Sequence, residues 1–230
     1  LALDIRDQQS LKRLHRAIVL SSTYQQTSQV NEQLLEADPD NRWLTRSPRR
    51  RLEAEAVRDS MLAVAGRLRR EMGGPSYQDF VIEHPEHSPH YEYALHDPRD
   101  PGAMRRSIYR FIARSQTNPL MTSLDCADPS IQVDVRSEST SATQALSLLH
   151  NALTIMAAEE WAERVGTECN ITADSTRLDM QPAVRRMFAD ALSREPADEE
   201  TATLVELAGQ HGLSAVARVL FNLNEFFYVD

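Results

Sequence analysis

Four histidines lie close together in a proline-rich stretch of the chain. They are His84, His87, His90 and His96, and the first three are spaced three residues apart. Imidazoles at this spacing in an irregular loop can converge on Zn²⁺ or another transition metal. Carboxylates of the same stretch could complete the coordination: Glu83, Glu86, Glu92 and Asp97. The spacing matches no established metal motif, so the alternative is that these histidines hydrogen-bond the loop or face water.

Cys126 or a serine could serve as a nucleophile, and Asp125 and Asp128 flank Cys126. A Cys–His–Asp triad can be assembled on paper from these residues and one of the four histidines. However, the sequence contains neither a nucleophile-elbow motif nor a CxxC motif, and Asp next to Pro and Ser is typical of turns. We therefore interpret residues 125–130 as a turn. The chain also lacks a glycine-rich phosphate-binding loop.

Arginine supplies nearly all the basic charge, since the chain contains one lysine, Lys12. A guanidinium can bind a carboxylate or a phosphate through two parallel N–H donors. Five arginines form the candidate anion or partner site if the fold brings them together: Arg105, Arg106, Arg110, Arg114 and Arg136. The alternative, which is the commoner role of such residues, is that they form ion pairs that hold loops to helices.

The segment from Met104 to Ser115 must position most of these arginines. Its apolar residues fall at helical spacing, which predicts an amphipathic helix with the arginines off the apolar face. A strand is the alternative, because Ile, Tyr and Phe also suit a pleated surface. Asn118-Pro119 ends the segment, because the residue before a proline is pushed out of the helical region.

The longest apolar-periodic run of the chain begins near Ala142. A Ser or Thr at 139–141 can cap a helix there, and Gly166 tolerates the conformation that ends one, which predicts a single helix over about 142–165. Its apolar stripe is wide enough for the centre of a bundle and consists of Leu146, Leu149, Leu153, Met156, Ala157 and Trp161.

The remaining periodic segments predict further helices at about 11–22, 31–35, 48–71, 181–194, from 198 onward, and 215–224. A short strand is predicted at 77–82. The predicted fold is therefore mainly α, an irregular multi-helix bundle with a long non-helical insertion at about 72–101. We expect one domain over 1–230, comprising N-terminal helices (1–71), the His/Pro-rich insertion (72–101), central helices (102–166) and C-terminal helices (167–230).

Composition narrows the function classes. The net charge of −9 over 230 residues argues against nucleic acid as the main partner, and no apolar run is long enough to span a bilayer. The two cysteines, Cys126 and Cys169, fit no metal or haem-attachment motif, and could form a disulfide or stay as two thiols. The chain begins at Leu1, within what reads as a helix, so we expect it to be part of a longer protein.

Several motifs in a fixed order resemble one known family over nearly the whole chain. Two of them are Asp38-Pro-Asp-Asn-Arg-Trp-Leu and Leu124-Asp-Cys-Ala-Asp-Pro-Ser, and the others lie at residues 11–28, 51–62, 105–111, 143–149 and 218–230. They are similar to the planctomycete PSD-one family (domain of unknown function 1553). The chain departs from the family pattern at Arg136-Ser-Glu-Ser and at His150-Asn151.

This resemblance implies a domain context and a cellular location for the protein, but no particular reaction. Members are typically the C-terminal part of large proteins that often carry a cytochrome c-like domain upstream. The resemblance thus implies an extracytoplasmic protein, in the periplasm or at the cell surface. Its partners would be the upstream domains of the same polypeptide, with a c-type cytochrome domain among them. Haem c is expected only upstream, and no catalytic residue carries over from the family.

Three functions are consistent with these observations. The first is a binding or scaffold module whose Arg-rich and His-rich loops meet a partner domain. The second is a metal-assisted hydrolase that acts on a glycan or ester through the His84–His96 region. The third is an electron-transfer partner that docks to a c-type cytochrome in a salt-dependent manner.

Overall fold

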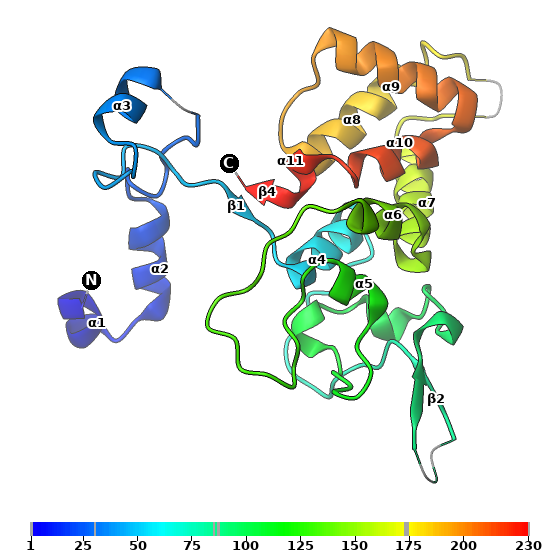
Figure 1. Ribbon diagram of the computed structural model, residues 1–230. Coiled ribbons are helices and arrows are strands. Elements are labelled where there is room, and N and C mark those ends of the chain that lie inside the picture. Colours follow the sequence, from blue (N-terminus) through cyan, green and yellow to red (C-terminus); the bar gives the residue numbers. More distant parts are fainter. Residues whose placement is uncertain (1, 30, 85, 87, 173–174, 230) are drawn as a thin grey trace. The chain divides into compact units, whose positions relative to one another are not determined.

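The computed structural model describes residues 2–29, 31–84, 86, 88–172 and 175–229 (Figure 1). Over these residues the chain forms eleven α-helices and four short strands, which confirms the predicted mainly α fold. The chain divides into two compact units, Leu1–Arg51 with Tyr228–Asp230, and Leu52–Phe227. None of the helices in the described ranges is both long enough and apolar enough to span a membrane.

The first unit is built from short helices and one small sheet. The helices are α1 (Ala2–Gln8), α2 (Leu11–Val19) and α3 (Glu32–Ala37), and β1 (Arg50–Arg51) pairs antiparallel with β4 (Tyr228–Val229). Ser10 caps α2 within the predicted helix region that begins at residue 11, because its hydroxyl accepts from the backbone N–H of Arg13 at 3.3 Å. Leu11, the first residue of α2, is 65% exposed.

The motif that begins at Asp38 forms a tightly bonded turn in this unit. The buried Asp38 carboxylate accepts from the backbone N–H groups of Arg42, at 2.8 Å, and Trp43, at 2.7 Å. The Arg46 guanidinium donates to the carbonyl oxygens of Asp38 and Pro39 at 3.1 and 2.7 Å. The Asn41 side chain also donates to the Arg46 carbonyl at 2.7 Å, so Asp38 and Asn41 of the motif and Arg46 just beyond it satisfy backbone groups that a turn leaves unpaired.

The second unit contains the rest of the secondary structure. A hairpin of β2 (Val81–Glu83) and β3 (His90–Glu92) lies within the predicted insertion. Short 3-10 helices cover Tyr93–Leu95, Pro101–Met104 and Ser107–Tyr109. The α-helices are α4 (Ala54–Val64), α5 (Pro119–Ser123), α6 (Ala142–His150), α7 (Ala152–Glu168), α8 (Gln181–Leu192), α9 (Asp198–His211), α10 (Leu213–Leu220) and α11 (Asn224–Phe227).

The core of the second unit is centred on α7, which packs against α4, α6, α8 and α10. Trp161 of α7 is fully buried and stacks on Phe221, with ring centroids 5.3 Å apart. Met156 and Ala157 are buried as predicted. The prediction for Leu146 is wrong, because 56% of that residue is exposed while its neighbour Leu148 is buried.

The predicted single helix over 142–165 is two helices. Asn151 adopts an extended conformation that ends α6, and its side chain accepts from the backbone N–H of Leu153 at 2.9 Å to cap α7. This break rotates the apolar stripe of α6 relative to that of α7, which is why Leu146 leaves the core. The helix also continues past Gly166 to Glu168, and Asn170 takes the left-handed conformation, with φ 56°.

The predicted helix over 104–115 is wrong. Residues 107–109 form a 3-10 turn, and the chain then runs beside Tyr77, whose N–H donates to the Tyr109 carbonyl at 3.0 Å and whose carbonyl accepts from Phe111 at 2.8 Å. The alternative of a pleated segment is closer to the structure, since Tyr77 and Arg110 form a parallel bridge.

The predicted helix over 48–71 is shorter than expected at both ends. Residues 50–51 form β1, so the helix α4 starts only at Ala54 and Ser47-Pro48 does not begin it. The C-terminal end comes early because Gly66 has φ 75°, and the following backbone N–H groups, of Arg67 and Leu68, both donate to the Leu62 carbonyl.

Candidate functional site

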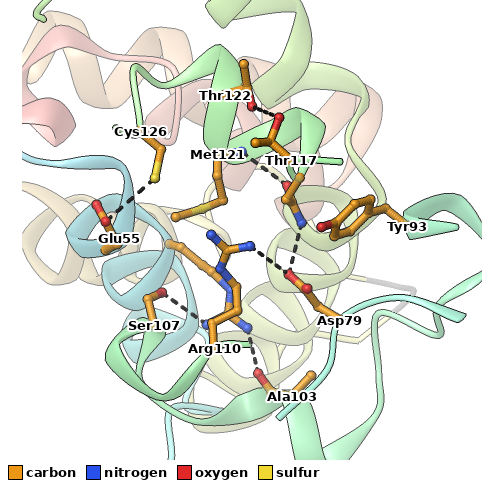
Figure 2. Close-up of polar contacts among 12 residues, drawn as sticks. Glu55, Asp79, Tyr93, Ala103, Ser107, Arg110, Thr117, Met121, Thr122 and Cys126 are labelled. Atoms are coloured by element: carbon orange, nitrogen blue, oxygen red, sulfur yellow. Dashed lines mark hydrogen bonds and ion pairs between the residues drawn. The ribbon is translucent and has the colours of Figure 1, made fainter. Parts of the chain in front are cut away.

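Two pockets lie next to each other in the second unit and share Tyr93 and Asn118 in their walls (Figure 2). The smaller pocket has a volume of about 100 Å³ and is lined by Tyr93, Arg110, Ile112, Ala113, Thr117, Asn118, Met121, Thr122, Cys126, Ala127, Asp128 and Pro129. The larger pocket, of about 310 Å³, is lined by Arg58, Asp79, Tyr93, Ala94, His96, Pro98, Ala103, Asn118, Pro119, His150, Asn151, Ala152 and Leu153.

A buried arginine of α4 holds one side of the larger pocket in place. Arg58 is 3% exposed and donates to the carbonyl oxygens of Ala103, at 2.6 Å, and Arg105, at 3.0 Å. Its neighbour Asp59 accepts from both the backbone N–H and the hydroxyl of Ser107, at 2.8 and 2.7 Å. Together these two residues fasten the irregular 103–107 segment to α4.

A second buried arginine lies where the two pockets meet. Arg110 is 9% exposed, and its Nη1 lies 3.7 Å from Oδ2 of Asp79. The Asn118 side chain donates to the same oxygen at 2.9 Å, and its own carbonyl oxygen accepts from the backbone N–H of Met121, which caps α5. Figure 2 shows the Arg110 guanidinium pointing into the space between Met121 and Asp79.

Two buried polar atoms beside this pair have no hydrogen-bond partner in the described part of the chain, the Tyr77 hydroxyl and Oδ1 of Asp79. Burial raises the pKa of Tyr77 to about 12, and the carboxylates of Asp79 and Asp59 act in the same direction against the charges of Arg58 and Arg110. Burial also raises the pKa of Tyr93. Both phenols are therefore neutral at physiological pH.

Cys126 lies in the wall of the smaller pocket, and its thiol donates to Oε1 of Glu55 at 3.6 Å. Burial raises the pKa of Cys126, and the negative charge of Glu55 adds to the effect. Burial by itself acts to raise the pKa of Glu55, but hydrogen bonds from Arg136, at 2.6 and 3.1 Å, keep that pKa below its usual value. The thiol is thus held in its unreactive protonated form beside an ionised carboxylate.

The loop that carries Cys126 is anchored at both ends. Asp125, at φ 63°, accepts from the backbone N–H of Ser139 at 2.8 Å and from the side chain of Gln144 at 2.9 Å. The ion pair of Arg136 with Glu55 anchors the other part of the loop to α4. The turn predicted from Asp125 and its neighbours therefore positions the wall of the smaller pocket. Within the described residues, Cys126 and Cys169 are free thiols.

The structure separates the histidines of the predicted metal site. The rings of His84 and His90 lie edge to face across the hairpin, with centroids 6.4 Å apart, whereas His96 lines the larger pocket, with Nε2 3.5 Å from Oδ2 of Asp100. His87 lies outside the described residues. Across the ranges the structure describes, no group of three or more His, Cys, Asp or Glu side chains could hold a metal ion. The four-histidine site, which includes His87, stays a prediction.

The five arginines of the predicted anion site have different surroundings. Arg105 donates to the carbonyls of Gly73 and Pro75 and lies over the Tyr109 ring, 4.2 Å from its centroid. Arg136 pairs with Glu55, and Arg110 lines the smaller pocket. The other two, Arg106 and Arg114, are exposed, and within the described ranges their side chains have no hydrogen-bond or ion-pair partner. The five guanidinium groups therefore do not form one cluster.

Several residues that line the larger pocket are absent from the predicted site: Arg58, Asp79, Tyr93, Asn118 and His150. The sequence could have indicated that Arg58 is buried, because Arg58 falls on the apolar face of its helix between Val57 and Met61. Asn118 also carried a signal, because Asn before Pro is typical of a helix cap. Asp79 carried none, because its importance depends on a pairing with a residue 31 positions later in the chain.

Comparison with protein families matches residues 1–208 to PSD1, described as a protein of unknown function (DUF1553). The chain belongs to this family, which confirms the resemblance inferred from its motifs. Searches of curated proteins and of solved structures found no significant match.

Proposed function

We propose that this chain is a binding and scaffold module of an extracytoplasmic, cytochrome-linked multidomain protein. The observation that carries the proposal is an exposed apolar surface that contains unpartnered cations. We call it the docking surface and define it by Arg106, Ile108, Phe111, Ile112, Arg114 and Ile131. Its apolar members are 39–75% exposed. Large apolar side chains that gather at the surface commonly mark an interaction site.

The members of the docking surface are held near one another. Five of them belong to the segment 106–114, in which a 3-10 turn over Ser107–Tyr109 is followed by the bridge of Arg110 to Tyr77. Ile131 follows Ser130, whose hydroxyl donates to the Arg114 carbonyl at 3.4 Å. Arg106 and Arg114 carry positive charge on a chain whose net charge is −9. Arginine among apolar side chains is favoured at protein interfaces, and the two charges favour an acidic partner.

Family membership supports the identity of the partner. The resemblance to PSD-one proteins implies upstream domains of the same polypeptide, including a c-type cytochrome domain that would hold the haem. We therefore propose these domains as the partner and the periplasm or the cell surface as the location. The raised pKa of Cys126 and its pairing with Glu55 favour binding over nucleophilic chemistry at this pocket.

Binding of the separately expressed upstream region to this chain tests the proposal. We expect Arg106→Glu with Arg114→Glu to weaken the complex at least tenfold, because charge reversal at two interface positions replaces attraction by repulsion. Isothermal titration at low and at physiological salt would measure the affinity and its salt dependence. Arg70→Glu is the matched control, since Arg70 is also exposed. An affinity that the double variant leaves unchanged would rule out this surface.

The larger pocket favours a second candidate function, a metal-assisted hydrolase that acts on a glycan or ester. It brings His96 and His150 to the same pocket as Asp79, so imidazole and carboxylate groups line one space of about 310 Å³. Pockets of this size hold small-molecule substrates. Histidines of the His84–His96 region would supply the metal ligands, and His96 is the member of that region that lines this pocket.

Elemental analysis of the full chain distinguishes the two functions. The hydrolase requires a stoichiometric metal that is lost in both His87→Ala and His90→Ala, together with hydrolysis of an ester or glycoside that falls at least a hundredfold in His96→Ala. The control His15→Ala, in α2, should keep both. A chain without stoichiometric metal and without turnover on either substrate class would leave only the binding module.

A further inference from the structure

The smaller pocket contains one strongly charged group whose hydrogen-bonding capacity is not used by the protein. The Arg110 side chain is 5% exposed, yet its one polar contact among the described residues is the ion pair of Nη1 with Asp79 at 3.7 Å. A guanidinium carries five N–H donors, and a buried charged donor without a partner is costly. Arg58, at a similar depth, instead donates to two carbonyls at 3.0 Å or less.

Most other polar side chains of the pocket already have at least one hydrogen-bond partner. The Thr122 hydroxyl donates to that of Thr117 at 2.9 Å, and both ends of the Asn118 amide are bonded. The Cys126 thiol donates to Glu55, and Oδ1 of Asp128 accepts from the Ser130 backbone N–H at 2.8 Å. Arg110 is therefore the positively charged group with free donors that a ligand of the pocket meets.

The remaining walls are apolar and close together. Ile112, Ala113, Met121 and Pro129 contribute hydrocarbon surface next to the guanidinium. The volume of about 100 Å³ leaves room for several water-sized groups and no more. The pocket thus combines N–H donors for the oxygens of a ligand with a short apolar slot for its hydrocarbon part.

The charges around the pocket decide which anion it accepts. Asp79 lies 3.7 Å from the guanidinium and Asp128 forms part of the wall, so two carboxylates oppose negative charge while Arg110 favours it. The Arg136 charge is matched by Glu55. A monoanion can offset the repulsion of the two carboxylates with hydrogen bonds to the free donors of Arg110, whereas a phosphate dianion would meet twice the net repulsion for the same donors.

We propose that the smaller pocket binds a small monocarboxylate. Its carboxylate accepts from the free donors of Arg110, and its short carbon chain lies against Ile112, Ala113 and Met121. This site shares Ile112 with the docking surface, but its binding group Arg110 and its apolar walls Ala113 and Met121 are not members of that surface. For a ligand of so few atoms we expect a dissociation constant in the millimolar range.

Methyl NMR of the full chain with labelled methionines tests the proposal with propionate as the probe. Met121 lines the pocket, whereas Met72 is 83% exposed and serves as the internal reference. We expect propionate to shift the Met121 methyl signal, assigned with Met121→Leu, in a saturable way. Sodium chloride at equal ionic strength should not shift this signal. Phosphate should bind at least tenfold more weakly than propionate. No saturable shift, or equal binding of phosphate, would overturn the proposal.

Variants test whether Arg110 is the binding group. Arg110→Gln should abolish the propionate shift, while Arg106→Gln, which removes the same charge from the exposed docking surface, should not. If Arg110→Gln does not fold, Asp79→Asn decides the matter. It keeps the shape of the side chain but removes the competing carboxylate, so propionate should bind several-fold more tightly. Unchanged or weaker binding in Asp79→Asn, or retained binding in a folded Arg110→Gln, would contradict the assignment.

Discussion

At the scale of single residues, two arginines buried to a similar degree have different roles, and their hydrogen bonds distinguish them. Arg58 uses its donors on backbone carbonyls of the 103–107 segment, which is a structural role. Arg110 has an ion pair at 3.7 Å and free donors that face a pocket, which suits a ligand. Burial and charge alone do not separate these cases, because a buried guanidinium is costly in either role until its donors are satisfied.

Tyr77 offers a test of this buried polar region through its ionisation. The folded protein keeps the phenolic proton up to a pKa of about 12, whereas the unfolded chain releases it near pH 10. The contribution to stability is therefore complete below about pH 10 and is lost as the pH rises to about 12, by roughly 2–3 kcal/mol. This loss adds to any other alkaline destabilisation.

We predict that Tyr77→Phe removes this part of the alkaline destabilisation. At neutral pH the substitution should leave the free energy of unfolding unchanged or raise it by up to about 1 kcal/mol, because the hydroxyl it removes has no partner in the described residues. Urea unfolding between pH 7 and 12 measures both effects. Tyr24→Phe is the control, since Tyr24 is 61% exposed and should change neither. A clear loss of stability at neutral pH would show that the hydroxyl is bonded.

At the scale of elements, the break between α6 and α7 organises the second unit. Asn151 ends one helix and caps the next, and the Arg218 guanidinium donates to the Leu149 carbonyl at 2.6 Å, which satisfies a carbonyl that the end of α6 leaves free. The break also places His150 and Asn151 in the wall of the larger pocket. A continuous helix would carry these two side chains in different directions.

We predict that Asn151→Ala lowers the free energy of unfolding by about 1 kcal/mol, because it removes the side-chain acceptor of the cap. Asn151→Asp should preserve most of the stability, since Asp caps helices equally well. Chemical denaturation of the three proteins measures the differences. If alanine and aspartate have the same effect, the cap is not what stabilises the break.

At the scale of the whole molecule, the buried apolar side chains are unevenly distributed. Over the described residues all of them lie between Ala54 and Phe227, within the second unit. The first unit is held largely by polar contacts, such as those of Asp38 and Arg46. Since apolar burial is the dominant favourable term in folding, the second unit should carry nearly all of the stability.

We predict that a protein of residues 52–227 folds cooperatively on its own. Its melting temperature should lie within about 2–4 °C of that of the full chain, which corresponds to roughly 1 kcal/mol for a domain of this size. Calorimetry and near-ultraviolet circular dichroism of both proteins measure this. A fragment that lacks a cooperative transition would support the single domain over 1–230 that the sequence predicts.

The helices with strong apolar periodicity were predictable from the sequence, because this periodicity depends only on residues that are close together in the chain. The regions of α8 and α9 were placed from apolar spacing, as was the start of α2 at residue 11. The predictions failed where distant backbone groups compete for the same residues. Residues 104–115 have a helical pattern, but pairing with Tyr77 holds 109–111 in an extended form. Similarly, pairing of Arg50 and Arg51 in β1 delays the start of α4.

By itself, the sequence determined the fold class, the family and the importance of the loop around Cys126, because these depend on local pattern and on motif order. Only the tertiary structure decided which of the five candidate arginines faces a pocket, that Asp79 and Asn118 join it there, and that His96 lies apart from His84 and His90. The physical reason is that a site consists of side chains from residues that are distant in the sequence. The periodicity of the sequence contains no information about which of these distant residues are in contact.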